Sequence, residues 1–202
     1  PLLDGLATSL GRPVEAVISD DYAGVIDNLR NNRIQLAWVG NRNAIDAVDN
    51  AGAEIFSQVL NSRGVPGYYS LLIVRTDRGF DDFDDVWTER RTVRFGFGDR
   101  SSTSGTTVPL YFLFAEAERD SGDFASVRHA DHEENFNDVL QGRVDVATIS
   151  SVMLQRFIDR NPTAAEQVKT IWASPLIPTD PLVWRRDLST ETKRVVSQFF
   201  LQ

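Results

Sequence analysis

The stretch TVRFGFGDRSSTSGTTVP, residues 92–109, contains a strand, a hydroxyl-rich loop and the start of a helix in direct succession. Val93, Phe95 and Phe97 alternate with other residues, as expected for a β-strand with one apolar face. A helix is predicted to begin near Thr106, because Pro109 is tolerated only in a first helical turn. This order of strand, loop and helix predicts an α/β fold.

The rest of the chain shows the same alternation of apolar periods. Apolar spacing predicts helices in segments 3–10, 20–32, 43–52, 78–87, 107–119, 132–143, 151–161 and 188–202. Alternating or continuous apolar runs predict strands at 14–19, 34–40, 68–76, 144–150 and 168–174. Repeated β-α alternation predicts mostly parallel sheets, with the apolar strand 68–76 in a central position.

Composition limits the classes of function. The chain has 202 residues, 42% of them apolar, which suits one large domain or two small lobes. Its net charge of -8 argues against a nucleic-acid surface and against an anionic membrane. The absence of Cys excludes disulfides, thiol catalysis and Cys-ligated zinc. The chain opens with PLLDGLATSLGR, which has the pattern of a mid-helix, so a trimmed fragment is expected.

The hydroxyl-rich loop has two interpretations. Ser102, Thr103 and Ser104 precede the predicted helix, where unpaired N–H groups and the positive end of the helix dipole favour an oxyanion. An ordinary Ser/Thr N-cap needs only one of these residues, and the stretch taken alone favours that interpretation. The stretch lacks both the Gly-Lys-Ser/Thr of a P-loop and the Gly-x-Ser-x-Gly of a hydrolase nucleophile.

A second cluster of polar residues is HADHEE, residues 129–134. His129, Asp131, His132 and Glu133 form the densest set of metal-ligand side chains in the chain, but His-Glu-x-x-His is absent. A metal site, a single His donating to an anion, and a solvated helix start all remain open.

Three further residues have a functional and a structural interpretation. Tyr22 opens a predicted helix, where it also fits an apolar stripe. Tyr68 and Tyr69 precede a strand, so at most one of them faces a cleft. Asp180 lies between two Pro-fixed positions, which suit either a rigidly held carboxylate or a turn.

The order of these segments closely resembles the periplasmic phosphonate-binding proteins of phosphonate ABC importers. The matching blocks, in chain order, are DYAGVIDNLRNNRIQLAWVGNRNAIDAV, PGYYSLLIV, GDRSSTSGTTVP, DHEENF, VDVAT and IWASPLIPTDPLVWR. The resemblance implies a type II periplasmic-binding-protein fold of two α/β lobes joined by two hinge crossings. Lobe 1 is expected to comprise 1–76 plus 175–202, and lobe 2 to comprise 77–174. The family's first strand and its C-terminal helices are expected to be missing.

The resemblance also assigns a ligand site, position by position. The phosphonate cradle falls on Ser102, Thr103 and Ser104, completed by Tyr22, Tyr68 and His132. Asp180 matches a carboxylate that aminoalkylphosphonate binders use for the ligand's ammonium group. A second such carboxylate, a Glu in those proteins, is replaced here by Val152. Loss of one charged partner weakens binding by roughly 1.5–3 kcal/mol, so methylphosphonate, phosphite or phosphate become alternative ligands.

The implied function is that of a periplasmic solute-binding component of an ABC importer, not an enzyme. Its expected partners are a small phosphonate-type anion, such as 2-aminoethylphosphonate, and a membrane permease. No cofactor, metal, nucleic acid or direct membrane insertion is expected. Two alternatives stay open, namely a Ser- or metal-dependent phosphohydrolase on a similar scaffold and a ligand-binding lobe of a sensor protein.

Overall fold

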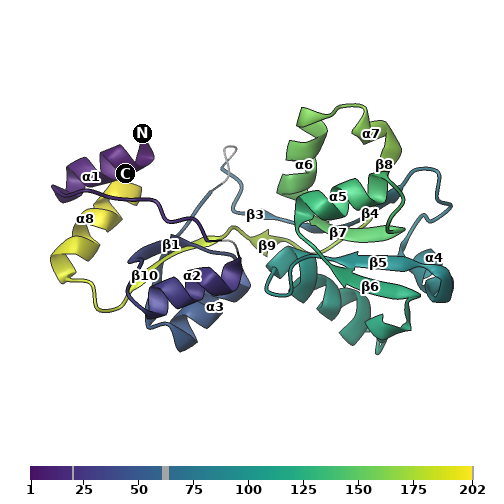
Figure 1. Ribbon diagram of the computed structural model, residues 1–202, viewed down its shortest axis with the longest axis horizontal. Coiled ribbons are helices and arrows are strands. Elements are labelled where there is room, and N and C mark those ends of the chain that lie inside the picture. The colour runs from purple at the N-terminus through teal and green to yellow at the C-terminus, as the bar shows by residue number, and fades with distance from the viewer. Residues whose placement is uncertain (20, 61–63, 202) are drawn as a thin grey trace. The chain divides into compact units, whose positions relative to one another are not determined.

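The computed structural model describes residues 1–19, 21–60 and 64–201, which divide into two compact units. Unit 1 comprises Pro1–Pro66 and Thr179–Gln202, and unit 2 comprises Gly67–Pro178. The chain therefore passes between the units twice, after Pro66 and after Pro178 (Figure 1). The sequence placed these crossings near residues 76 and 175. Residues 67–76 and 175–178 instead belong to unit 2. The strand at Ser70–Arg75 pairs on both sides with strands of that unit.

Unit 1 is a three-stranded sheet covered on both faces by helices. Its elements are α1 (Leu2–Leu10), α2 (Tyr22–Arg30), β1 (Leu36–Trp38), α3 (Asn41–Asn50), β2 (Ala53–Gln58), β10 (Pro181–Arg185) and α8 (Thr190–Phe200). The strand order is β1-β10-β2, and both pairings are antiparallel. Fully buried Val183 packs with α2 and α3 on one face, while Trp184 packs with α1 and α8 on the other. Successive residues of β10 therefore point to opposite faces of the sheet.

The strand predicted at 14–19 is wrong. These residues have no regular secondary structure, and Ile18 is 93% exposed. No strand among the described residues pairs with them, and an apolar run without a pairing partner does not make a strand. Strand β2 was not predicted, since only Ala53 of its six residues is buried.

Unit 2 contains a five-stranded sheet with helices on both faces (Figure 1). Its helices are α4 (Phe83–Thr88), a continuous helical segment at 103–115, α5 (His132–Leu140), α6 (Ser151–Arg160) and α7 (Ala164–Gln167). Its strands are β3 (Gly67–Tyr68), β4 (Ser70–Arg75), β5 (Arg94–Phe97), β6 (Ser126–His129), β7 (Val146–Ser150), β8 (Val168–Ala173) and β9 (Ile177–Pro178). The sheet order is β6-β5-β7-β4-β8, and β3 pairs separately with β9.

The direction of the strands corrects the prediction of mostly parallel pairing. In unit 2, β5 is parallel to β6 and β7, whereas β4 is antiparallel to both of its neighbours. In unit 1, β10 is likewise inserted antiparallel between β1 and β2. These two antiparallel strands, β4 and β10, both begin shortly after a crossing, so each starts at the end of its sheet where the chain arrives from the other unit. Sequence periodicity carries no signal for this inversion, because a strand buried on both faces looks alike in either direction.

The buried residues of unit 2 form one apolar cluster on each face of the sheet. Leu72 and Val74 of β4 pack with α4 and the helical segment 103–115, whereas Ile73 packs with α5, α6 and α7. The interior position expected for the apolar run 68–76 is therefore confirmed for β4. Among the described residues, no helix is long and apolar enough to cross a membrane.

Candidate functional site

The hydroxyl-rich stretch forms the beginning of a helix at the carboxyl end of β5. The helix begins at Thr103, three residues before the predicted start, so Thr103 and Ser104 lie in its first turn. Ser102 is the N-cap, and its Oγ accepts a hydrogen bond from the Gly105 amide at 3.0 Å. The first turns are π-helical, with the Thr107 amide donating to the Ser102 carbonyl at 3.0 Å. First-turn amides of a helix point outward, which is the arrangement that binds anions.

Two glycines allow this helix start to lie against the end of β5. The Gly98 amide donates to the Gly105 carbonyl at 2.7 Å. A Cβ added to Gly98 would lie 2.5 Å from the Gly105 Cα, and one added to Gly105 would lie 2.7 Å from the Gly98 Cα. Larger residues at either position would force the two backbones apart. We call Gly98 together with residues 102–105 the hydroxyl cradle.

Buried hydroxyl groups hold the carbonyl side of the hydroxyl cradle. Ser70 Oγ donates to the Ser104 carbonyl at 2.6 Å, and Thr148 Oγ1 donates to the Gly105 carbonyl at 2.6 Å. Thr148 Oγ1 also accepts from the Gly98 amide at 3.0 Å. Thr106 Oγ1 donates to the Gly98 carbonyl at 2.9 Å. These hydrogen bonds satisfy the Gly98, Ser104 and Gly105 carbonyls inside the protein and fix the position of the helix start.

Sequence reasoning missed Ser70 and Thr148, which are both fully buried. Both lie in strands of mainly apolar residues, and no signal in the sequence distinguishes them from packing residues. Asn135 was missed as well. It is fully buried, and its Nδ2 donates to the Phe97 carbonyl at 3.0 Å and to the Thr148 carbonyl at 3.2 Å. Asn135 therefore ties together the ends of β5 and β7 beneath the cradle.

His132 lies at the same edge of the unit 2 sheet. Parallel pairing of Phe97 with His129 brings the carboxyl ends of β5 and β6 together. His132 is the first residue of α5, after the N-cap Asp131, whose carboxylate accepts from the Glu134 amide at 2.7 Å. Within the described residues its buried Nδ1 has no hydrogen-bond partner. Burial lowers the pKa of His132, and the opposing charge of Asp131 offsets this only in part, so the imidazole is neutral at pH 7.

The metal interpretation of segment 129–134 finds no geometric basis. His129 Nδ1 lies 2.8 Å from the Gly98 carbonyl, so this ring is used to hold the cradle. Across residues 1–19, 21–60 and 64–201, no three His, Asp or Glu side chains gather as metal ligands.

Tyr68 and Val152 belong to segments that end at this edge. Tyr68 pairs with Ile177 and is half-buried, while the neighbouring Tyr69 is 43% exposed. Val152 follows Ser151, whose Oγ accepts from the Tyr69 amide at 3.1 Å, and is 48% exposed. The structure thus brings Tyr68, His132 and the hydroxyl cradle to one edge of the unit 2 sheet.

The two remaining candidates lie in unit 1. Tyr22 is the first residue of α2, and the N-cap Asp21 accepts from the Gly24 amide at 2.8 Å. Asp180 directly precedes β10, and its Oδ1 accepts from Nδ2 of Asn41, the first residue of α3, at 3.5 Å. Both candidates are half-buried polar side chains at the ends of elements.

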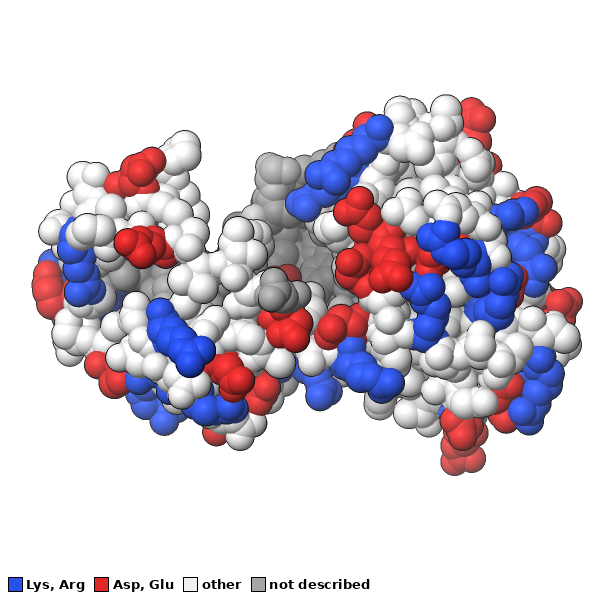
Figure 2. Space-filling view, viewed as in Figure 1, with Lys and Arg blue, Asp and Glu red and all other residues white. Residues whose placement is uncertain are grey.

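Charge does not mark out the site. Figure 2 shows positive and negative side chains lying next to one another over the visible face of each unit. The charges on this face are therefore mixed in sign, and the side-chain donors of the hydroxyl cradle are neutral hydroxyls.

Two α/β units joined by two crossings, with a hydroxyl-rich helix start in one of them, have the architecture of a type II periplasmic binding protein. A solved structure of this class, a binding-protein component of an ABC phosphonate transporter from Pseudomonas aeruginosa, matches with a TM-score of 0.93 and 41% identity. That match covers 99% of this chain and 67% of the other. The family model described as "ABC transporter, phosphonate, periplasmic substrate-binding protein" matches residues 1–202. The chain belongs to this family of binding proteins, whose resemblance the sequence blocks had indicated.

Curated relatives agree with the family assignment. The "Phosphonates-binding periplasmic protein" of Escherichia coli is 40% identical over 201 residues, covering all of this chain and 60% of the relative. The "Phosphate-import protein PhnD" of Mycolicibacterium smegmatis is 28% identical, covering 88% of this chain and 57% of the relative. This chain thus spans about 60% of the length of these curated relatives. A Prochlorococcus marinus PhnD1 structure in complex with methylphosphonate shares the fold, with a TM-score of 0.85 at 18% identity over 99% of this chain and 76% of that one.

Proposed function

We propose that this chain is the ligand-binding part of a periplasmic solute-binding component of an ABC importer, and that its ligand is a small alkylphosphonate. The observation that carries the proposal is the hydroxyl cradle, in which first-turn amides and the hydroxyls of Ser102, Thr103 and Ser104 gather at one helix start. A phosphonate group has several oxygens and accepts hydrogen bonds from all of these donors. A membrane permease is the partner that such a component requires.

Each cradle hydroxyl has a separate role in the proposal. Ser102 Oγ already accepts from the Gly105 amide, so its own proton is available to the ligand. Thr103 and Ser104 supply first-turn amides as well as hydroxyls. His132, neutral and half-buried, donates one hydrogen bond without adding a fixed charge. No side chain needs to react, which distinguishes this chemistry from that of a phosphohydrolase.

The proposal extends to the groups attached to the phosphonate. The family resemblance assigns Tyr22 and Tyr68 to the phosphonate and Asp180 to an ammonium group, which favours 2-aminoethylphosphonate. Val152 weighs against tight binding of that ligand, because it supplies no second carboxylate. Phosphate is the second candidate ligand, since one of the curated relatives is named for phosphate import.

Titration calorimetry and thermal shift with 2-aminoethylphosphonate, methylphosphonate, phosphite and phosphate test the proposal. We expect saturable binding of at least one phosphonate, weakened at least tenfold by Ser104→Ala, since hydrogen bonds to charged groups contribute about 1.5–3 kcal/mol. Ser126→Ala, an exposed Ser of β6, is the matched control and should bind like the unaltered chain. Absence of heat and of thermal shift with all four anions would refute the proposal.

The phosphohydrolase alternative makes a different prediction. A hydrolase would turn over a phosphoester, and the turnover would be lost in Ser104→Ala or after addition of a chelator. The family to which the chain belongs consists of binding proteins, so we expect binding without turnover.

A further inference from the structure

A cavity of about 150 Å³ lies in unit 2, at the edge of the sheet opposite the hydroxyl cradle. The cradle follows the last residue of β5, whereas Arg94 is the first residue of that strand. Arg75 ends the inverted strand β4, and Asp145 directly precedes β7, so both lie at the same edge as Arg94. The cavity is lined by Arg75, Arg78, Arg94, Gly142, Val144 and Asp145. Nothing in the proposed function uses these residues.

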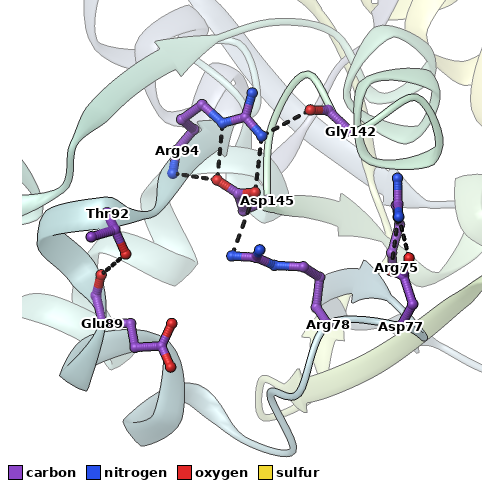
Figure 3. A network of polar contacts seen from close by, with 8 residues as sticks. All are labelled: Arg75, Asp77, Arg78, Glu89, Thr92, Arg94, Gly142 and Asp145. Carbon is purple, nitrogen blue, oxygen red and sulfur yellow. Dashed lines mark hydrogen bonds and ion pairs between the residues drawn. The ribbon is translucent and has the colours of Figure 1, made fainter.

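Arg94 and Asp145 form the rigid wall of the cavity (Figure 3). The Arg94 guanidinium donates to both carboxylate oxygens of Asp145, at 2.9 and 3.0 Å, and its amide donates at 2.9 Å. The same guanidinium donates to the Gly142 carbonyl at 2.8 Å. Burial by itself raises the pKa of Asp145. Hydrogen bonds from Arg94 and the charges of Arg78 and Arg94 lower it by a larger amount, so the pKa lies below its usual range and this carboxylate stays ionised.

Arg78 is the least satisfied charged group of the cavity. Its guanidinium approaches Asp145 from the side opposite Arg94, but the closest pair of atoms is 3.6 Å apart, too long for a hydrogen bond (Figure 3). Its Nε is buried and has no hydrogen-bond partner among the described residues. The guanidinium stacks over Phe80, with its central carbon 5.0 Å from the ring centroid, which limits its orientation. A buried, unmatched donor of this kind destabilises the protein unless a ligand or water accepts from it.

The absence of a side chain at Gly142 leaves room for a third guanidinium at the cavity, that of Arg75. The φ of Gly142 is +66°, and a Cβ at this position would lie 3.1 Å from Nη1 of Arg75. Arg75 also pairs with Asp77, from which its Nε is 2.9 Å away. Three guanidinium groups and one carboxylate, Asp145, therefore line the cavity, and Asp77 pairs with Arg75 beside it. This leaves a local excess of positive charge in a chain that is acidic as a whole.

We propose that this cavity is a second binding site, distinct from the hydroxyl cradle, for a small oxyanion such as phosphate, sulfate or a carboxylate. Arg78 is the principal donor, and Arg75 and Arg94 flank the anion. The planar fork of a guanidinium matches two oxygens of such an anion at once. The cavity has room for several water molecules at about 30 Å³ each, which is enough for one tetrahedral anion. Because Arg75 and Arg78 are each 37% exposed, solvent screens the site and binding weakens with salt.

Side-chain Nε–Hε resonances of a ¹⁵N-labelled chain, recorded during a phosphate titration at low ionic strength, test the proposal. We expect saturable shifts at Arg78 and Arg94 and at the Gly142 amide, all with one dissociation constant. Arg78→Gln should raise the constant read at Gly142 by about tenfold or more. Arg75→Gln serves as a second variant, and Arg156→Gln, an exposed residue of α6, is the matched control that should change it less than about twofold.

The two sites are distinguished in the same spectra. A parallel titration with 2-aminoethylphosphonate reports on the amides of the hydroxyl cradle. The Arg78 result can therefore be interpreted even if the cradle does not bind this ligand and the proposed function fails. Linear, unsaturated shifts at Arg78, or equal constants in Arg78→Gln and Arg156→Gln, would overturn the inference. Saturable shifts that disappear selectively in Arg78→Gln and Arg75→Gln would support it.

Discussion

At the scale of single residues, the candidate site depends on where side chains are absent as much as on where they are present. Neither Gly98 nor Gly105 has a positive φ, so the need for glycine comes from close approach and not from backbone conformation. The stretch GDRSSTSGTTVP predicted that Ser102, Thr103 and Ser104 lie together at a helix start, and the structure has them there. It did not reveal that the two glycines touch, because that contact depends on where β5 ends relative to the helix.

Gly98→Ala should therefore damage the hydroxyl cradle directly. The added methyl would lie 2.5 Å from the Gly105 Cα, and overpacking of this kind costs about 1–3 kcal/mol of stability. We expect a lower midpoint of thermal unfolding and weaker phosphonate binding by calorimetry. Gly79→Ala is the matched control, because nothing lies within 4 Å of its Cβ position. Equal effects of the two substitutions would show that the close approach is unimportant.

Asp180→Asn separates the ammonium from the phosphonate part of the ligand. If Asp180 holds an ammonium group, the substitution should weaken 2-aminoethylphosphonate by about tenfold or more and leave methylphosphonate within about twofold. Asp49→Asn, an exposed carboxylate of α3, controls for the change in net charge. Calorimetric constants that fall equally for the two ligands would contradict the assignment of Asp180.

His132 makes ligand binding and stability depend on pH. Burial lowers its pKa in the folded state, so the unfolded state takes up a proton first as the pH falls. The free energy of unfolding should therefore decrease as the pH drops below about 6.5, and His132 should have no effect above that range. A bound phosphonate would favour the imidazolium and raise this pKa, so binding near pH 6 should take up a fraction of a proton.

Calorimetry in buffers of different ionisation enthalpy measures that proton uptake. His132→Gln should abolish it while keeping a hydrogen-bond donor at the position. Proton uptake that persists in His132→Gln would assign the titration to another group.

At the scale of elements, the cradle is held by hydroxyls on strands that the sequence pattern marks only as apolar. Thr148 lies in β7, where all five residues are buried, and nothing in its neighbours distinguishes it from a packing residue. The sequence identified β7 and the helix after β5, and it placed the helix start three residues late. The helix begins earlier because Ser102 caps it through Gly105, a local hydrogen bond that outweighs the signal from Pro109.

Thr148→Val tests this support with almost no change in volume. The substitution removes the hydroxyl that donates to the Gly105 carbonyl at 2.6 Å and accepts from the Gly98 amide at 3.0 Å, and it leaves these two groups bonded only to each other, at 2.7 Å. Each lost hydrogen bond costs about 0.5–1.5 kcal/mol, and phosphonate affinity should fall although Thr148 is buried behind the cradle. Thr170→Val in β8, where Thr170 is exposed, is the control. Chemical denaturation and calorimetry give the two readouts, and unchanged affinity in Thr148→Val would limit the residue to a packing role.

At the scale of the whole molecule, the sequence predicted two α/β lobes. It did not predict that the strand after each crossing runs antiparallel to its neighbours in the sheet. The resemblance supplied the lobes, whereas the inverted strands β4 and β10 follow from contacts between segments far apart in sequence. Segment 14–19 shows the opposite error. Its apolar residues predicted a strand, yet strand formation depends on a neighbour that local pattern does not reveal.

The two units differ in how their sheets are buried, and this difference predicts unequal local stability. In unit 2, β4 and β7 are almost entirely buried, and apolar clusters cover both faces of the sheet. In unit 1, the outer strands carry Trp38 at 64% and Ile55 at 50% exposure. Local opening is easier where fewer apolar contacts protect the backbone hydrogen bonds.

Native-state hydrogen exchange followed by mass spectrometry should therefore give the slowest exchange in β4, β5 and β7. Strands β1 and β2 should exchange faster by an amount that exceeds any difference in intrinsic rate. Saturating 2-aminoethylphosphonate should slow exchange at residues 102–107, because a bound anion must leave before the first-turn amides open to water. Ser104→Ala should remove that ligand effect and leave the order of the strands unchanged. Equal protection of β1 and β4 without ligand would mean that the two units open together, and that burial of each sheet does not set its local stability.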